Sequence, residues 1–159
     1  SVVATPGPTD ISRVLSFRIR RDGVSLRNVL DSRYGLEITA ARLAALNAST
    51  EDLERVRQRM SDLESKTTDS DFSQADIDLH RAIAIASHNP LILLLLDSLS
   101  QFLLDFRVEV VGRRKARGET LKPVVAEHQR IVDAILSRDV DRSGEAMRAH
   151  LEHSVALLD

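Results

Sequence analysis

Residues 76–99 read DIDLHRAIAIASHNPLILLLLDSL, and this one stretch contains the end of one helix and the start of the next. Asn89 followed by Pro90 is a strong start signal, because Asn caps the first backbone N–H groups and Pro lacks the N–H that this position leaves unpaired. Before the break, Asp76 and His80 lie four residues apart and therefore share one face of a helix. The stretch predicts two consecutive helices, the first with a carboxylate and an imidazole on its inner face.

The rest of the chain also has a composition typical of helical proteins. Among 159 residues there are 6 Gly, 4 Pro, 4 Phe and 1 Tyr, whereas strand-rich folds use more turn-forming and aromatic residues. Short connections favour antiparallel neighbours, so we expect an all-α fold, a single antiparallel helical bundle of six or seven helices. Apolar periodicity and capping signals predict these helices at about residues 10–21, 26–47, 50–66, 72–87, 90–114, 121–137 and 140–158.

Composition also excludes several classes of function. The formal net charge of -2 provides no basic excess to attract a nucleic-acid backbone. The absence of Cys excludes disulfides and thiolate metal sites. The longest apolar run, residues 91–96, is too short to span a bilayer, so we expect a cytoplasmic protein with no membrane partner. Residues 1–8 hold two prolines and a glycine and are expected to be a linker before one domain, residues 9–159.

Two more histidines are predicted to face the interior. His128 falls on the apolar stripe of its helix, and His150 lies beside the stripe of the last helix. A single buried His is usually a hydrogen-bonded core residue, but three histidines and an aspartate on three helices need a common partner. Asp76, His80, His128 and His150 suit a divalent metal, zinc first and then nickel, manganese or iron. The alternatives are a hydrogen-bonded Asp–His pair or side chains that reach solvent at a seam.

Other polar residues near these helices are expected to lie outside the metal site. His153 is predicted at the surface or behind the ligands, and Glu127 is predicted to point away from the stripe of His128. His88 precedes the Asn-Pro break, where an imidazole at a helix end has a structural role. The basic run of residues 113–117 is predicted to be a solvated loop.

Arg33 interrupts the apolar stripe of the helix predicted at residues 26–47. Such an arginine reaches the surface or pairs with Glu37 one turn on. Beside a metal pocket its planar guanidinium would instead anchor the carboxylate of an organic acid. Arg107, one turn after Leu103, is a second candidate anchor.

Residues 76–99, together with AEHQRIVDAILSRDVDRSGEAMRAHLEHS at 126–154, resemble the C-terminal effector-binding (FCD) domain of GntR-type, FadR-like bacterial transcription regulators. The resemblance covers about residue 10 to the end. It rests on an Asp-x-x-x-His pattern, a Glu-His before an Ile-rich helix, and a last His after a Met. It implies a divalent metal held by Asp76, His80, His128 and His150. It also implies that Arg33, in DSRYGLE, faces the effector. The usual Gly-Asn-Pro of the family reads His-Asn-Pro at 88–90 here, so that turn is expected to differ.

The same resemblance implies a function. A winged helix-turn-helix would precede such a domain, and SVVATP at residues 1–6 is similar to the last strand of a wing. We therefore expect a non-enzymatic, homodimeric sensor of a small organic acid that controls DNA only through an N-terminal domain absent from this chain. Two alternatives stay open: a metal-dependent hydrolase, for which no convincing extra base is present, and a ligand-free helical dimerisation domain.

Overall fold

The computed structural model describes residues 14–15, 17–19, 21–66 and 68–156 of the chain, and this part is helical with no strand. The all-α prediction is therefore confirmed. The linker predicted at residues 1–8 lies outside the described residues, and the helix predicted at 10–21 is described only in part. The later helices are α2 (Leu26–Asn47), α3 (Thr50–Glu64), α4 (Asp69–Ala86), α5 (Pro90–Ala116), α6 (Lys122–Leu136) and α7 (Val140–Ala156).

Side-chain caps explain where these helices begin. The Ser49 hydroxyl accepts a hydrogen bond from the backbone N–H of Asp52, and the Asp52 carboxylate accepts from that of Ser49, which completes the predicted capping box of α3. Asn89 caps α5 as expected. The start of α4 was predicted three residues too late, because Thr68 caps the helix and it begins at Asp69.

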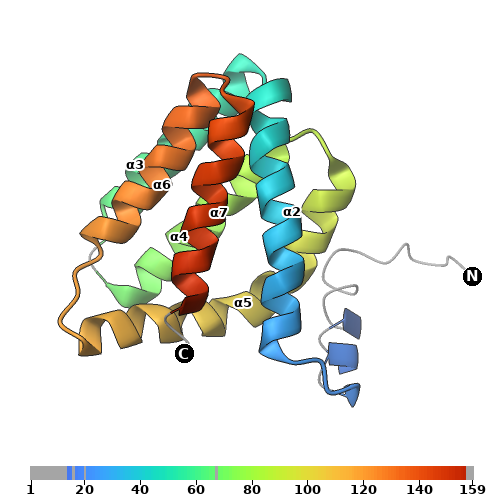
Figure 1. The fold of residues 1–159 in the computed structure, drawn as a ribbon, viewed down its shortest axis with the longest axis vertical. Coiled ribbons are helices and arrows are strands. Elements are labelled where there is room, and N and C mark those ends of the chain that lie inside the picture. The colour runs from blue at the N-terminus through green and yellow to red at the C-terminus, as the bar shows by residue number, and fades with distance from the viewer. Residues whose placement is uncertain (1–13, 16, 20, 67, 157–159) are drawn as a thin grey trace, which may run out of the picture.

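Figure 1 shows how the helices are arranged. α2 packs along α7, α7 packs along α6, and α3 packs along α4. α5 packs on α4 and crosses the end of the bundle at which α7 finishes. Consecutive helices run in opposite directions along most of the bundle, as short connections require. The start of α4, the start of α6 and the end of α7 therefore face α5. The polar inner residues of these three helices are brought toward α5.

The buried apolar side chains form two clusters. The larger cluster joins the second half of α2 to α3, α4, α6 and α7, and it includes Leu63, Leu79 and Ile131, all at 0% exposure. The smaller cluster joins the start of α2 to the middle of α5, through residues such as Leu30 and Leu103. Burial of each such side chain contributes about 1.5 to 3 kcal/mol.

Candidate metal and effector site

The four predicted metal ligands converge at the centre of the bundle. Asp76 and His80 come from α4, His128 from α6 and His150 from α7, and all four are buried. One donor atom from each lies within 4.8 Å of the others. His80 Nε2 is 3.3 Å from His128 Nε2 and 3.6 Å from Asp76 Oδ1, and His128 Nε2 is 2.7 Å from Asp76 Oδ1, which is the contact of the alternative Asp–His pair. A tetrahedral site with metal–nitrogen bonds of 2.0–2.1 Å separates its ligands by about 3.3 Å, so the arrangement fits a divalent ion.

Two of the imidazoles are oriented by a hydrogen bond from the ring nitrogen that faces away from the centre. His128 Nδ1–H donates to the carbonyl oxygen of Val124, 2.9 Å away. His150 Nδ1–H donates to Oε2 of Glu127, 3.1 Å away. Both rings therefore leave Nε2 for a metal, and such contacts behind the ligands fix the tautomer and the ring plane.

Glu37 on α2 plays the same part for His80 and also binds Arg33. Its carboxylate forms a close ion pair with His80 Nδ1 and another with Arg33 Nε, and Arg33 Nη2 lies 3.3 Å from Oε2. The pairing of Arg33 with Glu37 is one of its three predicted roles, beside reaching the surface and anchoring an acid. Burial raises the pKa of Glu37, but Arg33 and His80 outweigh it and hold this pKa well below its ordinary value. The carboxylate is therefore ionised although it is buried.

Arg107 on α5 makes the corresponding contact with the metal-ligand carboxylate. Its Nε lies 2.5 Å from Asp76 Oδ2, and its Nη2 lies 4.0 Å from Oε1 of Glu37. The Nε contact is an ion pair without the alignment of a hydrogen bond. Burial raises the pKa of Asp76, but Arg107 and His80 reverse this and keep it well below its usual range. Burial, and then the charge of Arg33, lower the pKa of Arg107 to about 10.

The histidines differ in their affinity for protons. Burial lowers the pKa of His80, but the carboxylates of Glu37 and Asp76 raise it above its ordinary value overall. Burial and the neighbouring His128 lower the pKa of His150 to about 3. His150 is thus a neutral imidazole at physiological pH, the form that binds metals.

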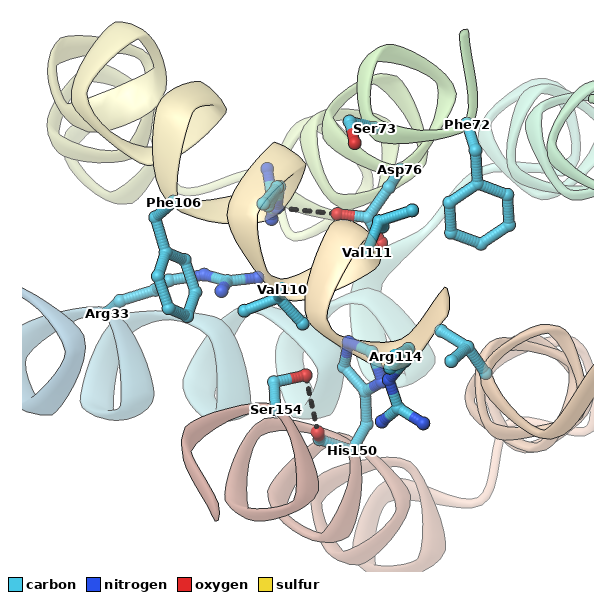
Figure 2. A pocket seen from close by; sticks show the side chains of 12 residues that line it. Arg33, Phe72, Ser73, Asp76, Phe106, Val110, Val111, Arg114, His150 and Ser154 are labelled. Atoms are coloured by element: carbon cyan, nitrogen blue, oxygen red, sulfur yellow. Dashed lines mark hydrogen bonds and ion pairs between the residues drawn. The ribbon is translucent and has the colours of Figure 1, made fainter. Parts of the chain in front are cut away.

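A small pocket is lined by two of the four donors, Asp76 and His150. Figure 2 shows Arg33, Asp76 and His150 directed into it from three helices, while α5 crosses it with Phe106 and Val110. Its cavity volume is about 30 Å³, which holds one or two water molecules. A larger ligand can enter only if the side chains at its rim move.

Glu127 lies off the stripe of His128, on the flank of α6, and does not join the four donors. That flank is covered by α7, so Glu127 is 6% exposed and accepts hydrogen bonds from His150 and from His153. One sequence prediction around this pocket was wrong, because the basic run is not a solvated loop but the last turn and C-cap of α5. Within it Arg114 is 3% exposed and lines the pocket. His153 itself is mostly exposed, in agreement with its predicted position at the surface.

The turn before α5 contains the residue that departs from the family pattern. His88 has a φ of 54°, in the left-handed region that favours Gly. Its Nε2 lies 2.7 Å from Oδ2 of Asp52, the carboxylate of the α3 capping box. A side chain at this position therefore links the α4–α5 turn to the start of α3, which Gly cannot do.

The FCD domain family matches residues 28–153. The chain belongs to the FCD domain family. This FCD domain is 34% identical, over 128 residues, to a regulatory protein ascribed to the L-lactate dehydrogenase operon of Escherichia coli (78% of this chain, 48% of that protein). It is 31% identical over 146 residues to the HTH-type transcriptional regulator LutR of Bacillus subtilis (89% of this chain, 65% of that protein). The chain spans between about half and two thirds of the length of these relatives.

Two solved structures share the fold of this FCD domain. Escherichia coli McbR/YncC superposes with a TM-score of 0.67 at 16% identity, over 85% of this chain and 69% of that one. A GntR-family transcriptional regulator from Pseudomonas syringae pv. tomato superposes with a TM-score of 0.64 at 17% identity, over 99% and 58%. The named relatives are regulators and not enzymes, as the sequence predicts. Within the described residues, no helix has the length and apolar character needed to cross a membrane.

Proposed function

We propose that this FCD domain binds a divalent metal and a small organic acid and thereby controls a DNA-binding domain, which residues 1–8 join to the domain at 9–159. Asp76, His80, His128 and His150 would hold the metal, zinc first. The observation that carries the proposal is that these four donors, from three helices, meet at the centre of the bundle, with carboxylate or carbonyl groups behind each imidazole. A bound ion would neutralise these donors, and an ion that takes five or six ligands would keep a position open for an oxygen of the acid.

Arg33 and Arg107 are the proposed anchors for the carboxylate of the acid. Both guanidiniums are buried and already paired with carboxylates, so an acid competes with Glu37 for the first and with Asp76 for the second. The pair of Arg33 and Glu37 lies within α2, whereas the contacts of Arg107 with Asp76 and Glu37 join α5 to α4 and α2, so an acid that binds Arg107 changes the contacts that hold α5 to both helices. Such a difference in contacts is what allows a ligand to favour one arrangement of a protein over another. The relative ascribed to an L-lactate dehydrogenase operon supports a small hydroxy acid as the effector class.

The proposal includes a homodimer. α5 exposes Leu91, Leu95 and Val108 at 61%, 38% and 41%, and Phe17 is 60% exposed. Exposed apolar side chains of this size are favourable in a surface that a second copy covers. Sedimentation velocity of the wild type and of the Leu91→Glu, Leu95→Glu double variant checks this, because we expect a dimer only for the wild type.

Calorimetric titration of L-lactate tests the effector site, with the metal content of each protein measured by elemental analysis. Arg33→Lys keeps the charge but loses the planar pair of donors, so we expect binding to weaken by about 1 to 3 kcal/mol with the metal retained. Arg27→Lys is the matched control, since Arg27 lies on the same helix but is exposed and pairs with Asp31. Equal affinity of wild type, Arg33→Lys and metal-stripped protein would show that neither the arginine nor the metal contacts the acid.

A further inference from the structure

Arg114 is a buried cation of the same pocket for which the proposed function gives no role. It is 3% exposed, and Figure 2 shows it beside His150 and Ser154 at the pocket. Among the described residues, its ion-pair partner is Glu119, whose Oε2 lies 3.3 Å from Nη1. The side chain of Glu119 is 39% exposed. A buried guanidinium with five N–H donors thus has one contact, to a carboxylate at the protein surface.

The end of α5 determines where this carboxylate lies. Gly118 adopts a φ of 73°, its N–H donates to the carbonyl oxygen of Lys115 at 2.9 Å, and the N–H of Glu119 donates to that of Arg114 at 3.0 Å. These two bonds form the Schellman motif that commonly ends helices. The motif joins the backbone of Glu119 to that of Arg114, and the Glu119 carboxylate reaches back to the guanidinium at the rim of the pocket.

Arg114 differs from the other two buried arginines of the pocket in where its counter-charge lies. Arg33 and Arg107 pair with the buried carboxylates of Glu37 and Asp76, and the buried carboxylate of Glu127 pairs with His150 and His153. The charge of Arg114 is compensated from the surface, by Glu119. An uncompensated buried charge is costly, so a ligand that brings a second negative charge into the pocket is favoured over one with a single charge.

The spacing of the arginines on α5 limits the length of such a ligand. Arg107 and Arg114 are seven residues apart and lie on the same face. Seven residues of helix span about 10.5 Å, and contacts of about 4 Å between guanidinium and carboxyl carbons at each end leave roughly 2.5 Å between two carboxyl carbons when both contacts lie along the helix axis. That separation matches a dicarboxylate of three carbons, and contacts that lie off the axis admit one or two carbons more.

We propose that Arg114 forms a second anion subsite, at which one carboxylate of a short dicarboxylic acid replaces Glu119 while the other binds at Arg33 and Arg107. This inference rests on the proposed function, because it uses the same pocket and the same first anchor. Glu119 then acts as a built-in competitor of the effector. Its displacement also moves a side chain away from the rim of a pocket that is too small for an acid.

Calorimetry with two series of acids tests the subsite. Malonate, succinate and glutarate are titrated against propionate, butyrate and valerate, each into metal-loaded protein. We expect Arg114→Met to weaken the best dicarboxylate ten- to hundredfold and its monocarboxylate less than threefold, since a hydrogen-bonded charge pair is lost only with the former. Glu119→Gln removes the competitor and is expected to strengthen the dicarboxylate at least threefold. Arg113→Met is the control, because Arg113 is the neighbouring arginine but pairs with Glu109 on the outer surface.

Failure of the Arg114 subsite can be told apart from failure of acid binding at Arg33. If Arg114→Met weakens both series equally, or if Glu119→Gln leaves the dicarboxylate unchanged, the subsite is wrong, while a loss of monocarboxylate binding in Arg33→Lys would still support the first anchor. If no acid of either series binds the wild type but L-lactate does, the subsite fails and the proposed function stands; if L-lactate does not bind either, both fail. Should Arg114→Met not fold, Glu119→Gln decides the question alone, because Glu119 lies at the surface.

Discussion

Replacing Glu127 by Gln changes the group that orients His150 without changing its size. The Glu127 carboxylate uses both oxygens, since Oε2 accepts from His150 Nδ1 at 3.1 Å and Oε1 accepts from His153 Nδ1 at 2.6 Å. A Gln has one acceptor and one donor in the same places. With the Gln oxygen toward His150, the bond from Nδ1–H is kept but its acceptor has lost its charge, and the NH2 group requires His153 to accept with Nδ1. With the amide reversed, His150 must carry its proton on Nε2, where the metal would bind.

The expected loss of zinc affinity can be estimated from groups that orient metal ligands in other proteins. Removing a group that orients a metal ligand typically weakens metal binding 10- to 100-fold, or about 1.4 to 2.7 kcal/mol. At saturating zinc this loss lowers the stability of the holo protein by the same amount, which shifts the melting temperature of a domain of this size by roughly 3 to 10 °C. With excess chelator we expect a much smaller difference from the wild type.

Zinc affinity by competition with a chromophoric chelator, and melting curves with zinc or with EDTA, measure both effects. His153→Gln is the first control, because it leaves the Glu127–His150 bond in place and should keep the affinity within about threefold. Glu145→Gln, the same change at an exposed position of α7, is the second. Wild-type zinc affinity in Glu127→Gln would refute the argument that this carboxylate prepares His150 for the metal.

Four further substitutions test what stabilises the fold. Burial raises the pKa of Asp52, but the Ser49 hydroxyl and His88 lower it overall to about 2. Because the pKa of Asp52 is lower in the folded than in the unfolded state, the stabilisation by its carboxylate is complete above about pH 4 and is lost as pH falls through about 2. In urea unfolding at pH 7, we expect Asp52→Asn to have a free energy of unfolding about 1 to 2 kcal/mol below that of the wild type. If this difference between the two proteins does not become smaller by pH 2.5, the prediction is contradicted. Gly118 has a φ of 73°, so Gly118→Ala should lower the free energy of unfolding by about 1 kcal/mol. Gly112 lies inside α5 with open space at its Cβ, so Gly112→Ala should raise the free energy of unfolding by up to about 1 kcal/mol. A change of the same sign in both variants would contradict this argument. Ile131→Ala, at 0% exposure, should cost about 2 to 5 kcal/mol in the same assay, and a loss below 1 kcal/mol would show that the core collapses around it.

The sequence predicted the fold well because the helix starts are local features. Asn89, Pro90 and the Ser49–Asp52 box cap helices through their own neighbours, so these boundaries could be predicted without knowledge of the packing. Helical spacing likewise placed His80 and His128 on inner faces, since the face depends only on residue number. The start of α4 was missed because its residues 69–71 are polar and only the cap at Thr68 marks them as helical.

The groups behind the ligands could not be predicted in the same way. Glu127 lies on the flank of its helix, and whether that flank is covered depends on how α7 packs against α6. Arg114 lies in a run of basic residues at a helix end, where composition indicates solvent, and it is buried only because α5 crosses the bundle there. The role of Glu37 behind His80 joins α2 to α4, which no spacing within one helix reveals.

The polar centre also divides the protein into two parts that need not unfold together. Along α2, Val29 and Leu30 belong to the smaller apolar cluster and Ala40 and Ala44 to the larger one, with the charged pair of Arg33 and Glu37 between them. Cooperativity passes through continuous apolar contact, so a layer of ion pairs is a natural boundary between units of local opening. The smaller unit should exchange its amide protons through partial opening, at a lower free energy than the larger one. A ligand that binds both α2 and α5 at this polar layer would raise the protection of the amide protons of the smaller unit against exchange before that of the larger unit.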